Sequence, residues 1–222
     1  GWNRVKLYFM LGLPTEQQED MEGIALLSEK IAQAYYDTVP KEQRHGKVQI
    51  VASSSFFVPK PFTPFQWARM CTREEFLERA YIVKDKFKQM KNAKSLKYNW
   101  HEADLSVLEG VLARGDRRLS AVIEAAYKNG ALFDSWGECF HNQLWMKAFE
   151  DNGIDPDFYT TRERSLDEIF PWDFIDAGVS KEFLKQEWKK ALDETVTPNC
   201  RQRCSGCGAK SFGGGVCYED QN

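Results

Sequence analysis

Four of the six cysteines of this 222-residue chain lie close together near its carboxyl end. Three have the spacing Cys200-x3-Cys204-x2-Cys207, and Cys217 follows. Four thiolates suit zinc or an iron–sulfur cluster, because both bind soft sulfur ligands. Glycines between and after these cysteines would let the chain wrap tightly around such a centre. We therefore expect an auxiliary iron–sulfur cluster, with zinc or a tail without any ligand as the alternatives.

A second group of candidate residues is the basic segment Arg114-Gly115-Asp116-Arg117-Arg118, where one expected helix ends and the next begins. Guanidinium groups bind carboxylates and phosphates through paired hydrogen bonds, so this segment is a candidate substrate contact. The alternative is that Asp116 caps the second helix while the arginines are solvated.

Two histidines are the remaining polar candidates. Glu138 and His141 are three residues apart on an expected helix, where such a pair can bind a metal or relay a proton. A surface pair beside aromatic core residues is the alternative. His101 follows an expected strand end, the position that faces a ligand site in barrel folds, whereas His45 lies in a polar loop.

A glycine turn follows the first expected strand. Residues 6–12 form a nearly continuous apolar run, which predicts a strand buried on both faces. Thr15 is expected to cap the next helix, with Gln18 as its capping-box partner. Because ligands of parallel α/β folds bind at the carboxyl ends of strands, Gly12 is a candidate ligand contact. A simple strand-to-helix turn is the alternative.

The elements that would position these residues alternate between strand and helix. Further strands are predicted at 48–54 and 95–99, and helices at 15–36 and 72–90, the second capped by Thr72. The apolar stripe of the first helix is Met21, Ile24, Leu27, Ile31 and Tyr35. This alternation indicates a parallel α/β layer with right-handed crossovers. Three strands are too few to close a barrel, so we expect neighbouring strands from a longer chain.

Beyond residue 100 the pattern is helical. Helices are predicted near residues 105–113, 117–129, 138–151 and 181–193. The expected organisation is thus a sheet region at 1–100, a helical extension at 101–197 and a Gly/Cys-rich tail at 198–222. The tryptophans fall at helical or strand-end spacing, which core packing explains.

Composition narrows the class of protein. The net charge of −3 gives no general attraction to nucleic acids or anionic membranes, so we expect neither as a partner. No signal peptide or apolar run of membrane-spanning length is visible. Clustered cysteines differ from a spread disulfide framework and indicate a reducing, cytoplasmic location. The abrupt start at an apolar strand suggests a truncated segment.

Several stretches together resemble one family. They are KLYFMLGLPTE at 6–16, SFFVPKPFTPFQW at 55–67, LEGVLARGDRRL at 108–119, FDSWGECF at 133–140, RERSLDEIFPWDFIDAGVSKEFL at 162–184 and the cysteine tail. In this order they resemble a group of cobalamin-binding radical S-adenosylmethionine (SAM) proteins, over residues 1–217. The resemblance implies a partial (β/α) radical-SAM-type barrel followed by a helical region and a Cys-rich tail.

The resemblance also implies cofactors and contacts. The turn after the fifth barrel strand packs against the SAM adenine, which corresponds here to Met10, Gly12, Leu13, Pro14 and Glu16. The segment after the sixth strand also borders the adenine, which corresponds to Val58 and Pro59.

Two parts of the family pattern have no counterpart in these residues. The family's Cys-x3-Cys-x2-Cys motif for the catalytic [4Fe–4S] cluster and its cobalamin-binding region both come before this segment. Those regions would be its partners, its substrate is unknown, and alone it would be inactive. The rival interpretation is a non-enzymatic, zinc-binding interaction module.

Overall fold

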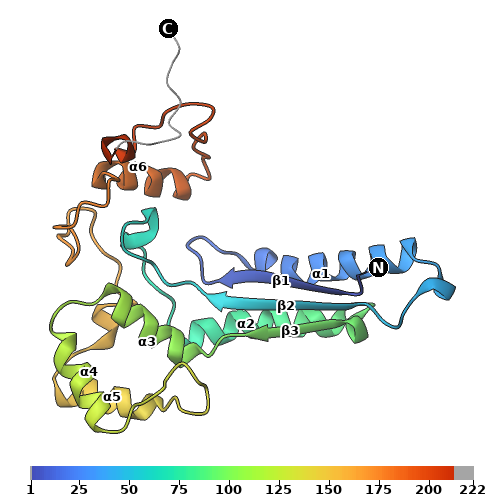
Figure 1. Ribbon diagram of the computed structural model, residues 1–222, viewed down its shortest axis with the longest axis horizontal. Coiled ribbons are helices and arrows are strands. Elements are labelled where there is room, and N and C mark those ends of the chain that lie inside the picture. The colour runs from blue at the N-terminus through green and yellow to red at the C-terminus, as the bar shows by residue number, and fades with distance from the viewer. Residues whose placement is uncertain (1, 213–222) are drawn as a thin grey trace.

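The computed structural model describes residues 2–212, in which three parallel strands and six α-helices form a mixed α/β fold. The strands are β1 (Arg4–Leu11), β2 (Gln49–Phe56) and β3 (Leu96–Trp100), and they pair in the order β1-β2-β3. Both pairings are parallel, so all three carboxyl ends point toward the loops and helices at one end of the sheet (Figure 1). The predicted alternation and the parallel sheet are confirmed.

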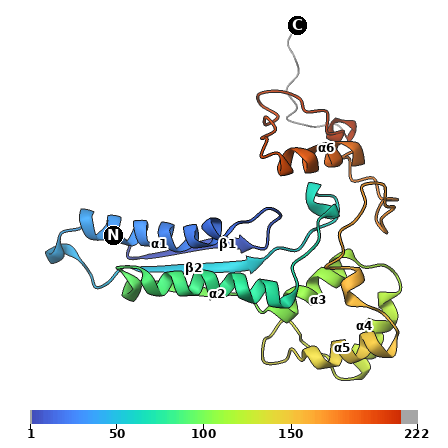
Figure 2. The same cartoon turned by 180° about the vertical axis from the view of Figure 1, so that it is seen from behind.

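Two long helices cover one face of this sheet. They are α1 (Gln18–Thr38) and α2 (Arg73–Gln89), which lie side by side in front of the strands in Figure 2. Apolar side chains of all three strands pack against them, and Phe76, Ala80 and Val83 of α2 are fully buried in this core. Burial of this apolar surface on folding is the main stabilisation of the layer.

The opposite face of the sheet is uncovered by any described element. Successive strand residues point to opposite faces, and the alternate side chains of β1 are exposed. The register places two rows across the three strands, Lys6–Val51–Lys97 and Tyr8–Ser53–Asn99. Tyr8 is 76% exposed. Parallel sheets are normally buried on both faces, so this face is unusual for its class.

The start of α1 differs from the prediction. Thr15 does not cap the helix, because it lies in the left-handed region with φ of 67°. Gln17 is the cap instead, and it forms a reciprocal capping box with Asp20. Leu27 was expected on the buried stripe but is exposed, and the small side chains of Ala25, Ser28 and Ala32 are buried in its place.

The cap of α2 is as predicted. The hydroxyl of Thr72 accepts a hydrogen bond from the amide of Glu75 at 3.2 Å, and the Glu75 carboxylate accepts one from the amide of Thr72 at 2.7 Å. This capping box satisfies two backbone donors that the first turn of a helix leaves free. It fixes where α2 starts, and therefore where its first turn lies relative to the sheet.

The rest of the described chain is helical, as predicted, with somewhat different bounds. The helices are α3 (Ala103–Arg114), α4 (Leu119–Lys128), α5 (Asn142–Asp151) and α6 (Lys181–Leu192). The first three share one apolar core, whereas α6 packs through a separate core on the short turn Pro64–Trp67 that follows the proline-rich segment. None of the helices within residues 2–212 has the length and apolar character that a membrane crossing requires.

Several local expectations in the helical region are wrong. Cys139 was expected within the helix at 138–151 but lies in a turn, because α5 begins only at Asn142. Trp136 is 62% exposed and does not belong to the core. The aromatic side chains around it made a buried helix the natural expectation, but a series of turns precedes α5.

Candidate functional site

A pocket of about 330 Å³ lies at the carboxyl end of β1. The turn Gly12–Glu16 forms one wall, and the segment between Ala68 and Cys71 forms another. Arg79 of α2 and Trp188 of α6 close the remaining sides. Four segments far apart in the sequence thus meet where parallel α/β folds place their ligand sites.

Two features of the pocket wall require a glycine at position 12: the conformation of its backbone and the close approach of neighbouring side chains. Its φ is +86°, in the region that glycine adopts without steric cost. A Cβ atom at this position would lie 2.7 Å from Cε1 of Phe76 and 3.1 Å from the sulfur of Cys71. The turn therefore lies directly on α2 and on the segment that precedes it, and a larger residue would fit only if Phe76 moved.

Glu16 holds the turn in place. Its carboxylate accepts hydrogen bonds from the Gly12 amide at 2.9 Å and from Nε of Arg79 at 3.2 Å, and its side chain is 6% exposed. Burial raises the pKa of Glu16, while the Gly12 amide and the Arg79 charge act against that shift. Because the Gly12 amide is occupied by Glu16, it is not free to bind a ligand.

The pocket combines apolar side chains with two arginines and two glutamates, so its charged groups balance. Leu13 is partly exposed at the turn, and Trp188 and Leu192 of α6 lie across from it. Arg69 pairs with Glu75 at 2.8 Å. Burial raises the pKa of the Cys71 thiol, which disfavours the thiolate, so Cys71 is not an activated nucleophile. This arrangement suits packing against a flat ligand better than acid–base chemistry.

The predicted cofactor contacts are brought together only in part. Gly12, Leu13, Pro14 and Glu16 line the pocket. Met10 instead lies on the uncovered face of the sheet, where it is 44% exposed. Val58 and Pro59 are buried beneath the surface. No sequence pattern indicated that Arg79, Cys71 and Trp188 line the pocket, because their positions depend on how α2 and α6 pack.

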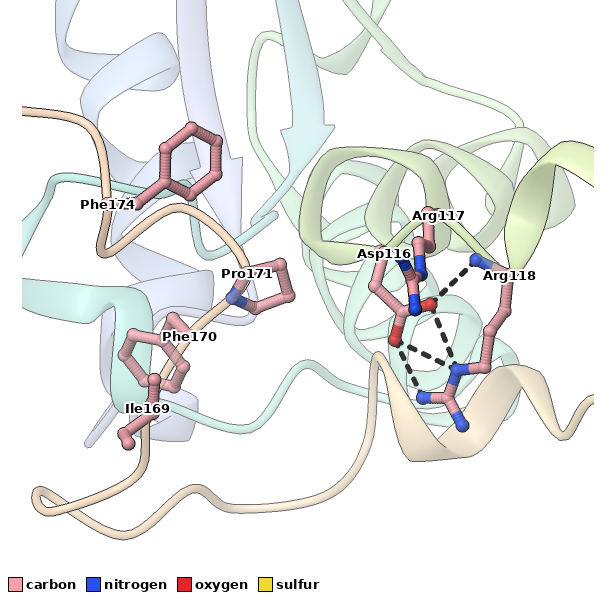
Figure 3. Close-up of a pocket in the computed structure, with 8 residues that line it drawn as sticks. Asp116, Arg117, Arg118, Ile169, Phe170, Pro171 and Phe174 are labelled. Atoms are coloured by element: carbon pink, nitrogen blue, oxygen red, sulfur yellow. Dashed lines mark hydrogen bonds and ion pairs between the residues drawn. The ribbon is translucent and has the colours of Figure 1, made fainter.

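The basic segment after α3 has a different role for each residue. Arg114 was expected either at a ligand or in solvent, but it is fully buried. Asp116 does not cap α4, because the residue at the N-terminal cap is Arg118. The Asp116 carboxylate accepts hydrogen bonds from the amide and the guanidinium of Arg118. Asp116 and Arg117 line a second cavity of about 810 Å³, shown in Figure 3.

The histidine candidates lie apart from both cavities. His101 is exposed just past β3, where its amide donates to the carbonyl of Ser54 at 3.1 Å. Glu138 and His141 do not share a helix, because Glu138 is in a turn and His141 is the residue before α5. Both are exposed, so the expected helical pair is not formed.

The cysteines of the tail are the last set of candidates. Cys200 and Cys204 are exposed and Cys207 is partly buried. Within residues 2–212, no three side chains of the Cys, His, Asp or Glu types are grouped as a metal site requires. Cys217, the fourth predicted ligand, lies outside the described residues. The metal site therefore stays a prediction.

Comparison with known proteins gives one distant relative. An uncharacterised protein of Methanocaldococcus jannaschii is 31% identical over 157 residues, which are 69% of this chain and 31% of the relative. The chain thus spans about a third of the length of the relative it matches. No family model matches the sequence, and no solved structure matches it.

Proposed function

We propose that this chain is the carboxyl-terminal part of a larger radical SAM protein, in which its three strands form one arc of a (β/α) barrel. The observation that carries the proposal is the uncovered face of the sheet. A parallel sheet with helices on one face only is what an arc of a barrel looks like without the remaining strands. The greater length of the archaeal relative is consistent with a longer chain.

The uncovered face has the side chains that the inner wall of a ligand-binding barrel needs. Lys6 and Lys97 flank Val51, and Ser53 lies between Tyr8 and Asn99 in the next row. Side chains of the inner face of a barrel point toward its axis, so these polar groups would face the cofactor or substrate. Their mixture of cationic, hydroxyl and amide groups suits a polar ligand better than a packed apolar core.

The pocket at the end of β1 would contribute to binding SAM. Leu13 and Pro14 present an apolar surface against which an adenine ring can pack, and Glu16 keeps that surface rigid by holding the Gly12 amide. When bound, a reduced [4Fe–4S] cluster supplies the electron that cleaves SAM. The residues described here would position SAM and exclude water, and they offer no group for the cleavage itself.

The family resemblance adds a cobalamin-binding region before the barrel and a possible methylation of an unreactive carbon. In this proposal the tail cysteines form an auxiliary site, since they follow α6 and not the first barrel strand. Neither the three strands nor the tail is sufficient for catalysis. The chain alone is therefore expected to be inactive, and the missing barrel half would be its intramolecular partner.

The experiment compares two proteins under anaerobic conditions, after reconstitution with iron and sulfide. One is this chain, and the other is the gene product that includes the region upstream of it. We expect release of 5′-deoxyadenosine from SAM by the longer protein and none by this chain. Cleavage of SAM by this chain alone, or an upstream region without a Cys-x3-Cys-x2-Cys motif, would contradict the proposal.

A matched pair of variants of the longer protein tests the pocket. Gly12→Ala places a methyl group in the turn and should raise the KM for SAM. Gly23→Ala, on α1, brings no atom beyond the neighbouring residues of its own helix within 4 Å of the added methyl, and it should leave the KM unchanged. An equal KM in both variants would show that the turn does not contact SAM.

A further inference from the structure

Two buried arginines form an unusual cluster between α3 and the segment that leads to α6. Arg114 is fully buried, and its guanidinium donates to the carbonyls of Thr160 and Gln66, both at 3.3 Å. Arg164 is 5% exposed and donates to the carbonyls of Arg114 and Tyr159 at 3.4 and 3.2 Å. The Nε atoms of both arginines have no hydrogen-bond partner in the described structure.

The positive charge of this cluster is only partly balanced. The carboxylate that acts on both arginines is that of Glu168, which pairs with Arg162 at 2.8 Å and attracts Arg114 and Arg164 more weakly. Burial and the neighbouring Arg164 lower the pKa of Arg114 to about 9, so it stays protonated at neutral pH. Three guanidinium groups thus share one carboxylate. Buried charges are normally paired, so an anion is expected nearby.

Neither buried arginine lines the larger cavity, but residues next to both of them do. Gly115 lines it and directly follows Arg114, and the ring of Phe170 lines it and lies 5.3 Å from the guanidinium carbon of Arg164. Figure 3 shows the residues Asp116–Arg118 on one side and the segment Ile169–Phe174 on the other. Charges in a low-dielectric interior are weakly screened, so we expect the cluster to add a positive contribution to the potential in this cavity.

The walls of the cavity differ in character. On one wall, Asp116 pairs with Arg118 at 2.6 Å, whereas Arg117 is exposed and has no ion pair among residues 2–212. On the other wall, Ile169 and Phe174 are each 86% exposed. An arginine without an ion pair and two large exposed apolar side chains therefore line the same cavity.

We propose that this cavity binds a phosphate monoester whose attached group is apolar. Arg117 would contact the phosphate directly, and Arg114 and Arg164 would favour it through their charge. The excess of two positive charges favours a dianionic phosphate over a carboxylate. Phe174 and Ile169 would pack on the apolar group and so be removed from water. This site is separate from the turn at Gly12 and does not depend on SAM chemistry.

Calorimetric titration of this chain at constant ionic strength tests the site with three probes: phenyl phosphate, inorganic phosphate and benzoate. We expect phenyl phosphate to bind about tenfold more tightly than inorganic phosphate, because its ring is buried on the apolar wall. We also expect it to bind more tightly than benzoate, because of its second charge. Equal affinity for phenyl phosphate and either other probe, or no binding at all, would overturn the proposal.

Surface variants keep the test independent of folding. Arg117→Gln should weaken phenyl phosphate about tenfold through the loss of a charge-assisted contact. The control Lys88→Gln removes the same charge from a lysine paired with Asp85 on α2 and should have no effect. Phe174→Ser should abolish the preference for phenyl over inorganic phosphate and leave inorganic phosphate binding intact. Undiminished binding in Arg117→Gln, or an unchanged preference in Phe174→Ser, would show that the ligand lies elsewhere.

Discussion

Nε of Arg79 lies 3.2 Å from a carboxylate oxygen of Glu16, so an ion pair joins α2 to the turn that precedes α1. Both crossover helices of the sheet are thereby fixed to each other at the end where the strands terminate. Because Glu16 also accepts from the Gly12 amide, the conformation of the turn depends on the position of α2. The shape of the pocket is thus set by tertiary contacts and not by the turn residues alone.

Glu16 should give the stability of the chain a characteristic pH dependence. Burial raises its pKa above the usual 4.5, so the folded chain binds this proton more tightly than the unfolded chain. Its contribution to the free energy of unfolding is therefore fully present below pH 4.5 and is lost as the pH rises through the folded pKa. Urea denaturation should show the stability of wild type relative to Glu16→Gln falling between pH 4 and pH 7.

Glu22, on the helix that follows this turn, supplies the opposite case. Its hydrogen bond with Lys86 lowers its pKa. Its contribution to the free energy of unfolding is therefore present above pH 4.5 and is lost as the pH falls. The stability of wild type relative to Glu22→Gln should therefore rise between pH 4 and pH 7. Curves of the same sign for both variants would mean that Glu16 is not the buried carboxylate described here.

Two glycine-to-alanine substitutions should have opposite effects on stability. Gly12→Ala puts a Cβ atom 2.7 Å from Phe76 at a φ of +86°, and we expect a loss of about 2 kcal/mol. Gly23→Ala lies within α1, where nothing crowds the added methyl, and we expect a gain of about 0.5–1 kcal/mol from helix propensity. Thermal denaturation followed by circular dichroism measures both. Similar midpoints for the two variants would contradict the close contact at Gly12.

Tyr98 should make the stability of the chain depend on pH in the alkaline range. Its hydroxyl is buried on β3 without a hydrogen-bond partner, and burial raises its pKa to about 12. Its contribution to stability is present below pH 10 and is lost as the pH rises toward 12, and it amounts to about 2 kcal/mol. Tyr98→Phe should therefore lose less stability than wild type between pH 10 and pH 12. A parallel loss in both proteins would place the hydroxyl in water.

Metal content tests the interpretation of the cysteine tail. Anaerobic purification followed by iron, sulfide and zinc analysis should find iron and sulfide, with absorbance near 400 nm, if the auxiliary cluster forms. Colourless protein with zinc would support the interaction-module alternative, since zinc has a filled d shell. Cys204→Ser should abolish binding, whereas Cys139→Ser, in a turn before α5, should not.

The periodic and local features of the fold could be predicted from the sequence. Apolar runs located β1 and β2, and Thr72 with Glu75 marked the start of α2 by a side-chain pattern that acts within one turn. The prediction that Thr15 caps α1 was wrong, because its backbone is left-handed and Gln17 is the capping residue. The backbone conformation of Thr15 depends on how the turn packs, and no local sequence pattern predicts that packing.

Only one wall of the candidate site could be predicted from the sequence. The turn at Gly12 is visible in the sequence, but Arg79 lies 63 residues beyond Glu16 and Trp188 lies on α6. Arg114 shows the same limit, because its burial depends on the carbonyls of Thr160 and Gln66. Contacts between distant segments decide these positions, and residue types alone do not specify them.

The chain order of the strands has a consequence for synthesis. Arg4 pairs with Gln49 and Ile50 with Leu96, so each strand meets its partner as soon as one intervening helix has been made. The sheet and both covering helices can therefore assemble as the chain leaves the ribosome, before α3 to α6 exist. The outer edge of β1 pairs with no strand among residues 2–212, so it is available to any strand synthesised before it.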